Sequence, residues 1–372
     1  LAIFVAIVPE GLPIILVITL GLGMRNMARH RAIVRRIKAV ETLGSTTVIC
    51  TDKTGTLTRN EMTVVQFYSE NTIYMIKGIG YDPTIKGITH KYSKKNIVLE
   101  NLLKSEGLVK AFTCASLCNN SQISKEKDVW EAIGDPTCSA TASFGWKTLG
   151  SADNIKKDSP RVHEFFFNTE RKRMTTINEL EDGKWAFTKG ALDPMEPLLT
   201  KKFKNGELVD ITDDDLEEIK KVNHSMASSA LRVLALACKK IDEDVDYKDI
   251  ENIESDLIFL GLIGIRDPPR SEAYEAIATC HEAGIRVIMI TGDQEYTAKS
   301  VAVELEICGE NSETISGYEL DSISDYELID LVEHINVFCR VTPEQKMRIV
   351  QALQRAGHVV AMTGDGVNDA PA

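Results

Sequence analysis

Residues 48–58 read "VICTDKTGTLT", and this stretch decides how the fold is built. The apolar residues Val48, Ile49 and Cys50 predict a buried strand, because short apolar runs are typical of strands covered on both faces. The strand runs directly into a small, hydroxyl-rich turn that carries one acid, Asp52, and one base, Lys53. We infer that Asp52 is placed for chemistry rather than for solubility.

Two later turns have the same form. Thr291-Gly292-Asp293 follows the apolar run "IRVIMI", and Gly364-Asp365-Gly366 follows "VVAMT". The run "LGLIGIRD" and helices expected at 272–283 and from Thr297 complete an alternation of strands and helices, which predicts an α/β fold with a doubly wound parallel sheet. All three turns should then lie at the carboxyl edge of one sheet, where such proteins build their sites.

Length and charge exclude some classes of protein. A chain of 372 residues is long enough for at least two domains, since single cores rarely grow beyond about 250 to 300 residues. The net charge of −12 predicts no nucleic acid partner, because phosphate backbones attract basic surfaces. The eight cysteines show neither a CxxC pair nor a disulfide framework, which indicates a reducing, cytosolic compartment.

The first 23 residues, "LAIFVAIVPEGLPIILVITLGLG", predict a transmembrane helix in a lipid bilayer, which about 20 apolar residues can span. A basic flank follows at 25–38, and such flanks are typical of the cytosolic side. These two features speak against the alternative, a buried core helix. We expect a basic helix from Ala32 to lead to the strand at Val48. Because the chain opens without Met or a signal peptide, we expect a piece of a longer protein.

One carboxylate, Glu10, interrupts the apolar segment. A carboxylate in mid-membrane is costly and usually marks an ion path. The flanking Pro9 and Pro13 break the helix and free backbone carbonyls, so that carbonyls and one carboxylate together predict an oxygen-ligand cation site.

Residues 61–262 differ from the sequence on either side in their pattern of polar and apolar residues. Polar loops and paired aromatic patterns such as "VHEFFFNTERKRMTTI" predict an inserted α+β domain with an antiparallel sheet. We therefore divide the chain into three parts. Residues 1–30 form a transmembrane segment and the start of a stalk, residues 31–60 and 263–372 form the two parts of the parallel-sheet domain, and residues 61–262 form the insertion.

The carboxylate of Asp52 is suited to accept a phosphoryl group and form an aspartyl phosphate. Asp365 is placed to share a hard divalent cation with it, and magnesium is the natural choice for oxygen ligands near phosphate. Lys346 would neutralise the transferring group. Small donors to the phosphoryl oxygens would come from Thr54, Thr291 and Gly292.

Two kinds of phosphate chemistry compete at this stage. No GxxxxGK[ST] sequence is present, which excludes a P-loop ATPase. A soluble phosphatase with an aspartyl intermediate benefits from a general acid two residues after the nucleophile, and this chain has Thr54 there. The phosphoenzyme should therefore persist, which suits an ATPase that uses it as a conformational state.

The motifs "DKTGTLT", "KGA", "DPPR", "TGD" and "GDGVNDAPA", in this order, resemble the P-type cation-transporting ATPases of type II. The resemblance covers essentially the whole chain and implies a haloacid dehalogenase-like phosphorylation domain with an inserted nucleotide-binding domain. It also implies that Asp52 is phosphorylated from ATP, and that Asp52, the Thr54 carbonyl and Asp365 hold Mg²⁺. The other residues implied in that site are Lys53, Thr54, Thr291, Gly292, Asp293, Arg340, Lys346, Asn368 and Asp369.

The same resemblance implies a nucleotide site in the insertion. Phe167 matches an aromatic that stacks on adenine, and this is physically reasonable because bases stack on rings and phosphates attract cations. Of the three phenylalanines at 165–167, we expect the other two to fill a core strand. Cys138 stands where many relatives carry glutamate, which puts one adenine-side contact in doubt. The residues implied as neighbours of the nucleotide are Lys172, Lys189, Gly190, Arg232, Asp267 and Arg340.

The segment "VAIVPEGLP" resembles the fourth membrane helix of calcium pumps. The resemblance implies that Glu10 and the carbonyls of Val5, Ala6 and Val8 bind the transported cation, with calcium favoured. A sodium or potassium pump stays open, and a soluble phosphatase or a non-catalytic module remains a weaker alternative. An actuator domain and further membrane helices of the same pump would be partners that this sequence does not contain.

Overall fold

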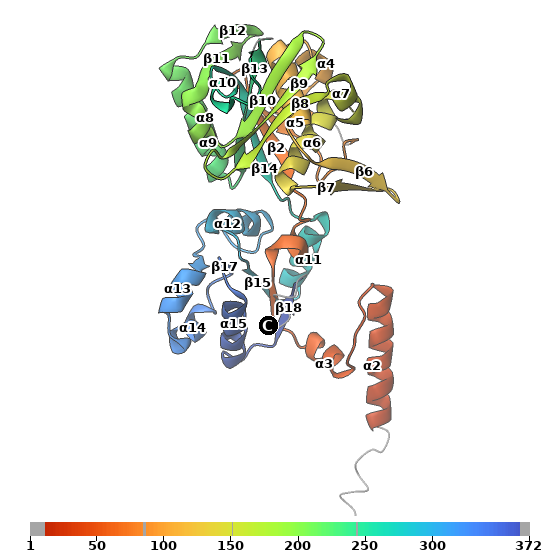
Figure 1. The fold of residues 1–372 in the computed structure, drawn as a ribbon. Coiled ribbons are helices and arrows are strands. Elements are labelled where there is room, and N and C mark those ends of the chain that lie inside the picture. The colour runs from red at the N-terminus through yellow and green to blue at the C-terminus, as the bar shows by residue number, and fades with distance from the viewer. Residues whose placement is uncertain (1–11, 85–86, 151, 243–244, 365–372) are drawn as a thin grey trace, which may run out of the picture. The chain divides into compact units, whose positions relative to one another are not determined.

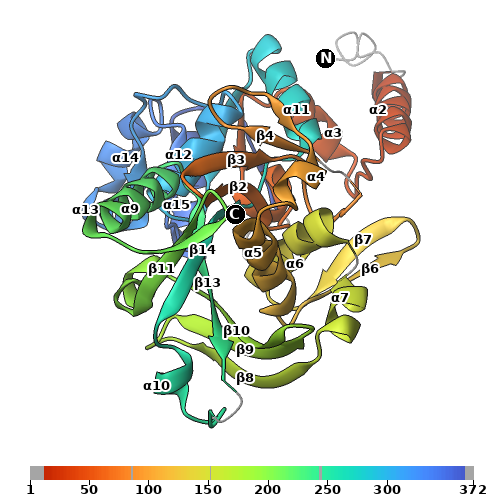
Figure 2. The same cartoon turned by 90° about the horizontal axis from the view of Figure 1, so that it is seen from above.

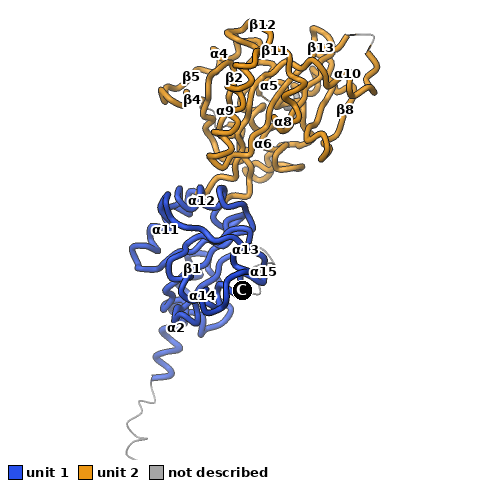
Figure 3. The backbone as a smooth tube through the Cα atoms, turned by 90° about the vertical axis from the view of Figure 1, so that its left-hand side faces the viewer, with its two compact units in different colours: residues 1–57, 271–372 blue, residues 58–270 orange. Residues whose placement is uncertain are grey.

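The computed structural model describes residues 12–84, 87–150, 152–242 and 245–364. The chain divides into two compact units (Figure 3), unit 1 with residues 1–57 and 271–372, and unit 2 with residues 58–270. Unit 2 therefore extends a few residues beyond both expected limits of the insertion, 61 and 262. The reason lies in a strand and a set of hydrogen bonds described below.

The apolar N-terminal segment is helical where the structure describes it. Helix α2, Leu12–Arg29, is long and apolar enough to cross a membrane by length and composition, and none of its residues is buried. It ends where Arg31 adopts a φ of 65° and the Ala32 N–H donates to the Met27 carbonyl at 2.9 Å. The left-handed Arg31 ends α2, and the helix expected from Ala32 to precede the strand at Val48 begins only at Lys38. The next helix is α3, Lys38–Gly44.

Unit 1 is built around a five-stranded parallel sheet with the order β16-β17-β15-β1-β18 (Figure 1). The predicted parallel sheet is confirmed for the strands that precede the three turns, since β1 pairs with β15 on one side and β18 on the other. The strands are β1, Val48–Thr51, β15, Arg286–Ile290, β16, Ile315–Ser316, β17, Val337–Cys339, and β18, Val360–Thr363.

Helices cover both faces of this sheet. Side chains alternate along the strands, so that Ile288 enters one core with α13, α14 and α15, while Met289 enters the other with α11 and α12. The expected helices at 272–283 and from Thr297 are therefore present, and the sheet is doubly wound. The helices are α11, Ser271–Glu282, α12, Glu295–Glu304, α13, Gly317–Ser322, α14, Asp325–Leu331, and α15, Pro343–Arg355.

Unit 2 is built around a mixed sheet of 11 strands in which nearly all neighbours are antiparallel, as expected for the insertion. Its main path is β5-β4-β3-β2-β14-β13-β10-β9-β8, and β11 joins β14. The strands are β2, Thr63–Ser69, β3, Thr72–Ile76, β4, Ile88–His90, β5, Asn96–Ile97, β8, Arg161–Asn168, β9, Arg173–Leu180, β10, Gly183–Gly190, β11, Leu199–Lys204, β12, Glu207–Asp210, β13, Arg232–Ile241, and β14, Leu257–Arg266. A separate hairpin is formed by β6, Gln122–Glu126, and β7, Val129–Ile133.

The placement of "LGLIGIRD" in the parallel sheet is wrong. This run belongs to β14, which pairs antiparallel with β13 and β2 in unit 2. An apolar run of this kind reads the same in a parallel or an antiparallel buried strand, so its partners are decided by tertiary contacts. The limit of unit 2 consequently lies beyond Arg266 rather than at Leu262.

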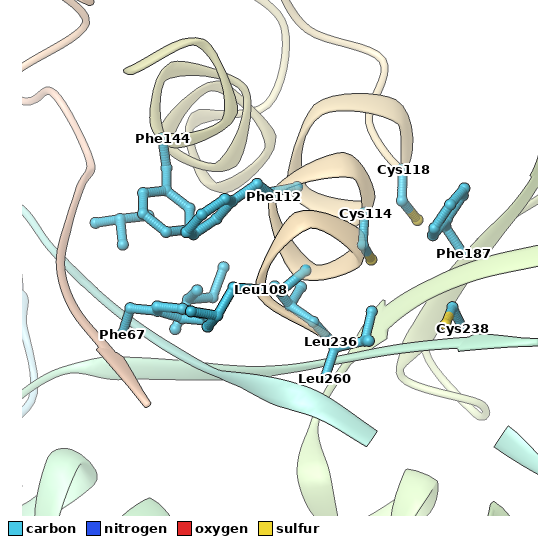
Figure 4. Close-up of a cluster of buried hydrophobic side chains, with 14 of the residues drawn as sticks. Phe67, Leu108, Phe112, Cys114, Cys118, Phe144, Phe187, Leu236, Cys238 and Leu260 are labelled. Carbon is cyan, nitrogen blue, oxygen red and sulfur yellow. The ribbon is translucent and has the colours of Figure 1, made fainter. Parts of the chain in front are cut away.

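Two helices fill the concave side of the large sheet (Figure 2). Helix α5, Glu106–Leu117, and helix α6, Pro136–Leu149, pack closely, because a Cβ at Gly145 would lie only 2.9 Å from the Ser116 nitrogen. The rings of Phe67, Phe112 and Phe144 contact one another in the core (Figure 4), with centroids 5.4 to 5.6 Å apart. The remaining helices of unit 2 are α4, Leu99–Leu102, α7, Ala152–Asp158, α8, Leu192–Met195, α9, Asp213–Ser228, and α10, Ile250–Ile253.

Hydrogen bonds join the two segments by which the chain enters and leaves unit 2, at Thr58 and at Arg270. The Thr58 hydroxyl donates to Asp267 Oδ2 at 2.6 Å, and both groups are buried. Arg270 Nε donates to the Thr58 carbonyl at 3.0 Å, and Thr58 also forms an isolated β-bridge with Pro269. These bonds tie residues 58 and 267–270 into the same unit, which explains its limits.

Candidate functional site

Asp52 lies immediately after β1, the strand that separates β15 from β18. Its backbone N–H continues the ladder to the Thr363 carbonyl at 3.0 Å. Its carboxylate accepts the Lys53 N–H at 2.8 Å through Oδ1, while Lys346 Nζ lies 3.1 Å from Oδ2. The carboxylate is only partly exposed and is held at the carboxyl edge of the sheet, as the sequence predicted for this residue.

The turn after Asp52 folds back sharply. Thr54 has φ −71° and ψ 128°, and Gly55 has a φ of 74°, a left-handed conformation that glycine adopts without a steric penalty. The turn buries Lys53 and brings the hydroxyl of Thr56 into the interior without a hydrogen-bond partner among the described residues. Thr56 was missed in the sequence prediction, although it belongs to the same hydroxyl-rich turn.

The second turn, after β15, meets the first through an ion pair. Lys53 Nζ pairs with Asp293 Oδ2. Asp293 is fixed in turn, because its N–H donates to the Thr291 hydroxyl at 3.2 Å and its carbonyl accepts the Arg340 N–H at 2.9 Å. Thr291 is buried, whereas Gly292 and the side chain of Arg340 are exposed. The structure therefore brings these predicted residues to the edge at which Asp52 lies.

Lys346 reaches Asp52 from the first turn of α15. The helix begins with Thr342 as its N-cap and Pro343 in the first turn, and Thr342 and Gln345 exchange two hydrogen bonds at 2.9 and 3.3 Å. Such a reciprocal cap fixes the start of the helix and therefore the direction of Lys346. The side chain of Lys346 is 6% exposed, so its charge is poorly screened by water at Asp52.

The third turn lies largely outside the described residues. Thr51 is level with Thr363 in the parallel pairing, so the chain reaches Gly364 beside Asp52. The predicted residues Asp365, Asn368 and Asp369 lie beyond that point and are not described. The predicted ligands of a transported cation, Val5, Ala6, Val8 and Glu10, lie outside the described residues as well.

The oxygen donors at this edge fit magnesium better than a soft metal. Asp52 supplies a hard carboxylate, the backbone of the following turn supplies carbonyls, and Asp365 comes directly after Gly364 in the sequence. The described residues contain no cluster of three or more His, Cys, Asp or Glu side chains suited to a metal.

A second group of predicted residues gathers at one end of the large sheet in unit 2, around Lys189. Lys189 on β10 is 5% exposed, and its ammonium lies 3.1 Å from Cys138 Sγ and 3.1 Å from Thr141 Oγ1 on α6. Both partners are neutral groups, and no carboxylate in the described part of the chain forms an ion pair with Lys189. A buried cation with neutral partners is suited to bind an anion. Cys138, where glutamate was expected, thus contacts Lys189 directly.

Phe167 lies two strands away from Gly190 at the same end. Asn168 pairs with Arg173, and Arg173 pairs with Gly190, so neighbouring strands separate these positions by roughly 10 Å. Phe167 is 61% exposed and Phe166 is 69% exposed, whereas Phe165 packs against a small core. The expectation that two of the three phenylalanines fill a core is therefore wrong, because the last residues of β8, the edge strand of the sheet, are exposed.

A tight turn between β8 and β9 presents Lys172. Lys172 has a φ of 48°, and its N–H donates to the Asn168 carbonyl at 2.7 Å. Its own carbonyl accepts the Ala191 N–H at 3.0 Å, and a Cβ at Gly190 would lie 2.5 Å from that carbonyl oxygen. Gly190 is thus required for the close approach of the two chains, and the Lys172 side chain is exposed.

The buried carboxylate of Glu254 stabilises this turn. The sequence did not predict this residue. It is 2% exposed, and it accepts hydrogen bonds from Arg171 at 2.6 Å, from Arg173 at 2.6 Å and from the Thr175 hydroxyl at 2.7 Å. The two arginines flank Lys172 in sequence, so one buried carboxylate fixes both sides of the turn. Glu254 and the two arginines lie about 80 residues apart in the sequence, so no local sequence pattern predicts this network.

The remaining predicted residues of unit 2 are Arg232 and Asp267. Arg232 lies at the start of β13, is exposed, and donates to the hydroxyl of Thr137 at 2.8 Å, next to Cys138. Asp267 lies one residue after β14 and accepts from the Thr58 hydroxyl and, at 3.3 Å, from the Glu61 N–H. Arg232 therefore belongs to the group around Lys189, whereas Asp267 bonds the two segments by which the chain enters and leaves unit 2.

Known proteins resemble the chain over its whole length. The family model for "P-type ATPase, cytoplasmic domain N" matches residues 107–272. The calcium-transporting ATPase 1 of Bacillus cereus is 40% identical over 367 residues, which cover 99% of this chain and 38% of that protein. The calcium-transporting ATPase of Bacillus subtilis is 40% identical over 369 residues, covering 99% and 41%, and calcium-transporting ATPase 1 of Saccharomyces cerevisiae is 38% identical over 379 residues, covering 99% and 38%. The chain spans about two fifths of the length of these relatives.

Proposed function

Because the chain belongs to the P-type ATPases, we propose that it is the phosphorylating and nucleotide-binding part of an ATP-driven cation pump. Unit 1 is then the haloacid dehalogenase-like phosphorylation domain, preceded by a transmembrane helix, and unit 2 is the nucleotide-binding domain. The observation that carries the proposal is the position of Asp52, at the carboxyl end of a central parallel strand with Lys346 Nζ 3.1 Å from its carboxylate. Acid-stable labelling of Asp52 from ATP tests it.

The residues around Asp52 support phosphoryl transfer. One carboxylate oxygen of Asp52 attacks the γ-phosphorus of ATP, the bond from that phosphorus to the β,γ-bridging oxygen breaks, and ADP leaves. Lys346 offsets the negative charge of the transferring group, and the hydroxyl of Thr56, buried without a partner in the described structure, is available to donate to it. A bound Mg²⁺, held by Asp52, the Thr54 carbonyl and Asp365, would offset further negative charge.

A soluble aspartyl-phosphate phosphatase is the weaker alternative. Such an enzyme benefits from a general acid close to the nucleophile, and position 54 is a threonine. The nearby carboxylate of Asp293 is engaged in an ion pair with Lys53 rather than placed beside the phosphoryl acceptor as a separate acid. A long-lived phosphoenzyme is therefore the better reading, and it suits a transport cycle.

The nucleotide site in unit 2 yields a prediction about Phe167. We expect Phe167→Ala to weaken ATP binding by about 1 to 3 kcal/mol, the range for a base stacked on an aromatic side chain. Phe166→Ala is the matched control, since it removes a neighbouring phenylalanine that is also exposed, at 69% against 61% for Phe167. Calorimetric titration of the 372-residue chain with ATP measures both. Equal losses in the two variants would assign the base to another surface.

We propose that the transported cation is calcium, as in the relatives named calcium-transporting ATPases. Glu10 offers a carboxylate and the prolines beside it free carbonyl oxygens, the ligand set that hard divalent cations prefer. The same reading places the residues after 30 in the cytoplasm. A sodium or potassium pump is the other candidate within the family.

Glu10→Gln tests both the ion and the site. The substitution removes one negative charge at nearly constant size, so phosphorylation from ATP should require much more cation or stop, while ATP binding at Phe167 should survive. The measurement is phosphoenzyme formation in the whole protein, titrated separately with calcium, sodium and potassium. Dependence on sodium alone would overturn calcium, and unchanged ion dependence in Glu10→Gln would overturn the role of Glu10.

A further inference from the structure

A cavity of about 290 Å³ lies in unit 2 away from the residues discussed so far. Its walls come from β3, β4 and β5, the short helix α4 and the last turn of α6. Four aliphatic side chains line it, and two lysines add positive charge. The six residues are Ile76, Ile88, Ile97, Leu99, Lys77 and Lys147.

Lys147 is the unusual member of this lining. It is 6% exposed, and it makes no hydrogen bond or ion pair with any residue that the structure describes. Burial lowers the pKa of its ammonium, and the charge of Asp82 opposes this shift without forming an ion pair. A buried ammonium is costly unless an anion pairs with it, and Lys147 has no ion-pair partner among the residues that the structure describes.

Two buried lysines of unit 2, unlike Lys147 and Lys189, have carboxylate partners among the described residues. Lys202 is 4% exposed and lies 2.7 Å from Asp215, and Lys110 is 8% exposed and lies 3.4 Å from Asp182. Each has a carboxylate partner of its own. Lys147 has a cavity instead, and the carboxylate that also lines it, Glu100, forms no ion pair with it.

We propose that this cavity binds a small aliphatic carboxylate, with its carboxylate on Lys147 and its hydrocarbon tail against the four aliphatic side chains. The ammonium provides a charge-assisted hydrogen bond to the carboxylate, and the apolar walls remove the tail from water. Lys77, an exposed residue of the lining, adds further positive charge. Inorganic phosphate fits less well, because the apolar walls offer it no partners.

The cavity is separate from the nucleotide site. Helix α6 carries Cys138 near its start and Lys147 near its end, nine positions later, which corresponds to about 13 Å along the helix. A carboxylate at Lys147 would therefore leave Lys189 and Phe167 accessible to ATP. The test does not depend on the proposed pump function.

Calorimetric titration of the 372-residue chain in lipid nanodiscs with sodium hexanoate tests the proposal, with empty nanodiscs as the blank. We expect saturable binding of one hexanoate, and binding at least roughly tenfold weaker in Lys147→Met, as loss of a hydrogen bond to a charged group implies. Acetate, which lacks the tail, and 1-hexanol, which lacks the charge, should both bind much more weakly. Lys104→Met, which removes an exposed lysine of the same unit, should bind hexanoate like the unchanged chain.

Thermal unfolding of Lys147→Met provides the check on folding. Methionine keeps most of the hydrocarbon stem and removes a charge without a partner, so the melting temperature should stay equal or rise. A variant that fails to fold would show that Lys147 has a structural partner, and the proposal would fall. Absence of saturable hexanoate binding, equal binding to Lys147→Met, or phosphate binding as strong as hexanoate binding would each overturn it too.

Discussion

Asp52→Asn is expected to abolish acid-stable labelling of the whole protein by γ-labelled ATP. The carboxylate of Asp52 is positioned by the Lys53 N–H at 2.8 Å and by Lys346 Nζ at 3.1 Å, at the end of a central strand. Asparagine keeps the shape of the side chain, but its amide oxygen is a poor nucleophile and cannot form the acyl phosphate. The loss should therefore be complete within detection, while ATP binding in unit 2 should be retained.

The control for this variant is Asp330→Asn, which changes the charge of unit 1 by the same amount at an exposed position. Its labelling should match that of the unchanged protein. Labelling that persists in Asp52→Asn would transfer the acceptor role to another carboxylate, and Asp293 would be the first to examine because it lies at the same edge of the sheet.

Glu254→Ala is expected to lower the free energy of unfolding of unit 2 by about 3 to 5 kcal/mol, the range for breaking a buried ion pair by removing one partner. Glu254 is 2% exposed and binds Arg171, Arg173 and the Thr175 hydroxyl at 2.6 to 2.7 Å. The substitution leaves two guanidinium groups close together without their shared carboxylate. It also frees the turn that presents Lys172, so ATP binding should weaken in the fraction that remains folded.

Tryptophan fluorescence during denaturant unfolding measures this effect selectively, because the three tryptophans of the chain, Trp130, Trp146 and Trp185, all lie in unit 2. Glu251→Ala is the matched control, since Glu251 is an exposed glutamate on the adjacent helix α10. It should change the unfolding free energy by no more than about 0.5 kcal/mol. A loss below 1 kcal/mol in Glu254→Ala would show that water replaces the carboxylate without penalty.

The sequence by itself determined the parallel sheet of unit 1 and the position of Asp52 at its edge. Short apolar runs followed by small polar turns are local signals, and the carboxyl ends of parallel strands share one edge, so Asp52 and Thr291-Gly292-Asp293 were expected together. The structure has β1 beside β15 and β18, with Lys53 joined to Asp293. The order of the motifs along the sequence likewise determined the family, because motif order can be recognised without knowing any tertiary contact.

Only the tertiary structure decided which buried groups meet across the chain. The strand "LGLIGIRD" joined the large sheet, the carboxylate of Glu254 met arginines about 80 residues away, and Lys189 met Cys138 rather than an acid. Lys147 likewise shares its cavity with side chains from β3, β4 and β5, which lie far earlier in the sequence. Local sequence patterns show which side chains are apolar and which face of a helix or strand they share. The partner of a buried charged side chain, however, comes from a distant part of the chain, and no periodic pattern in the sequence predicts it.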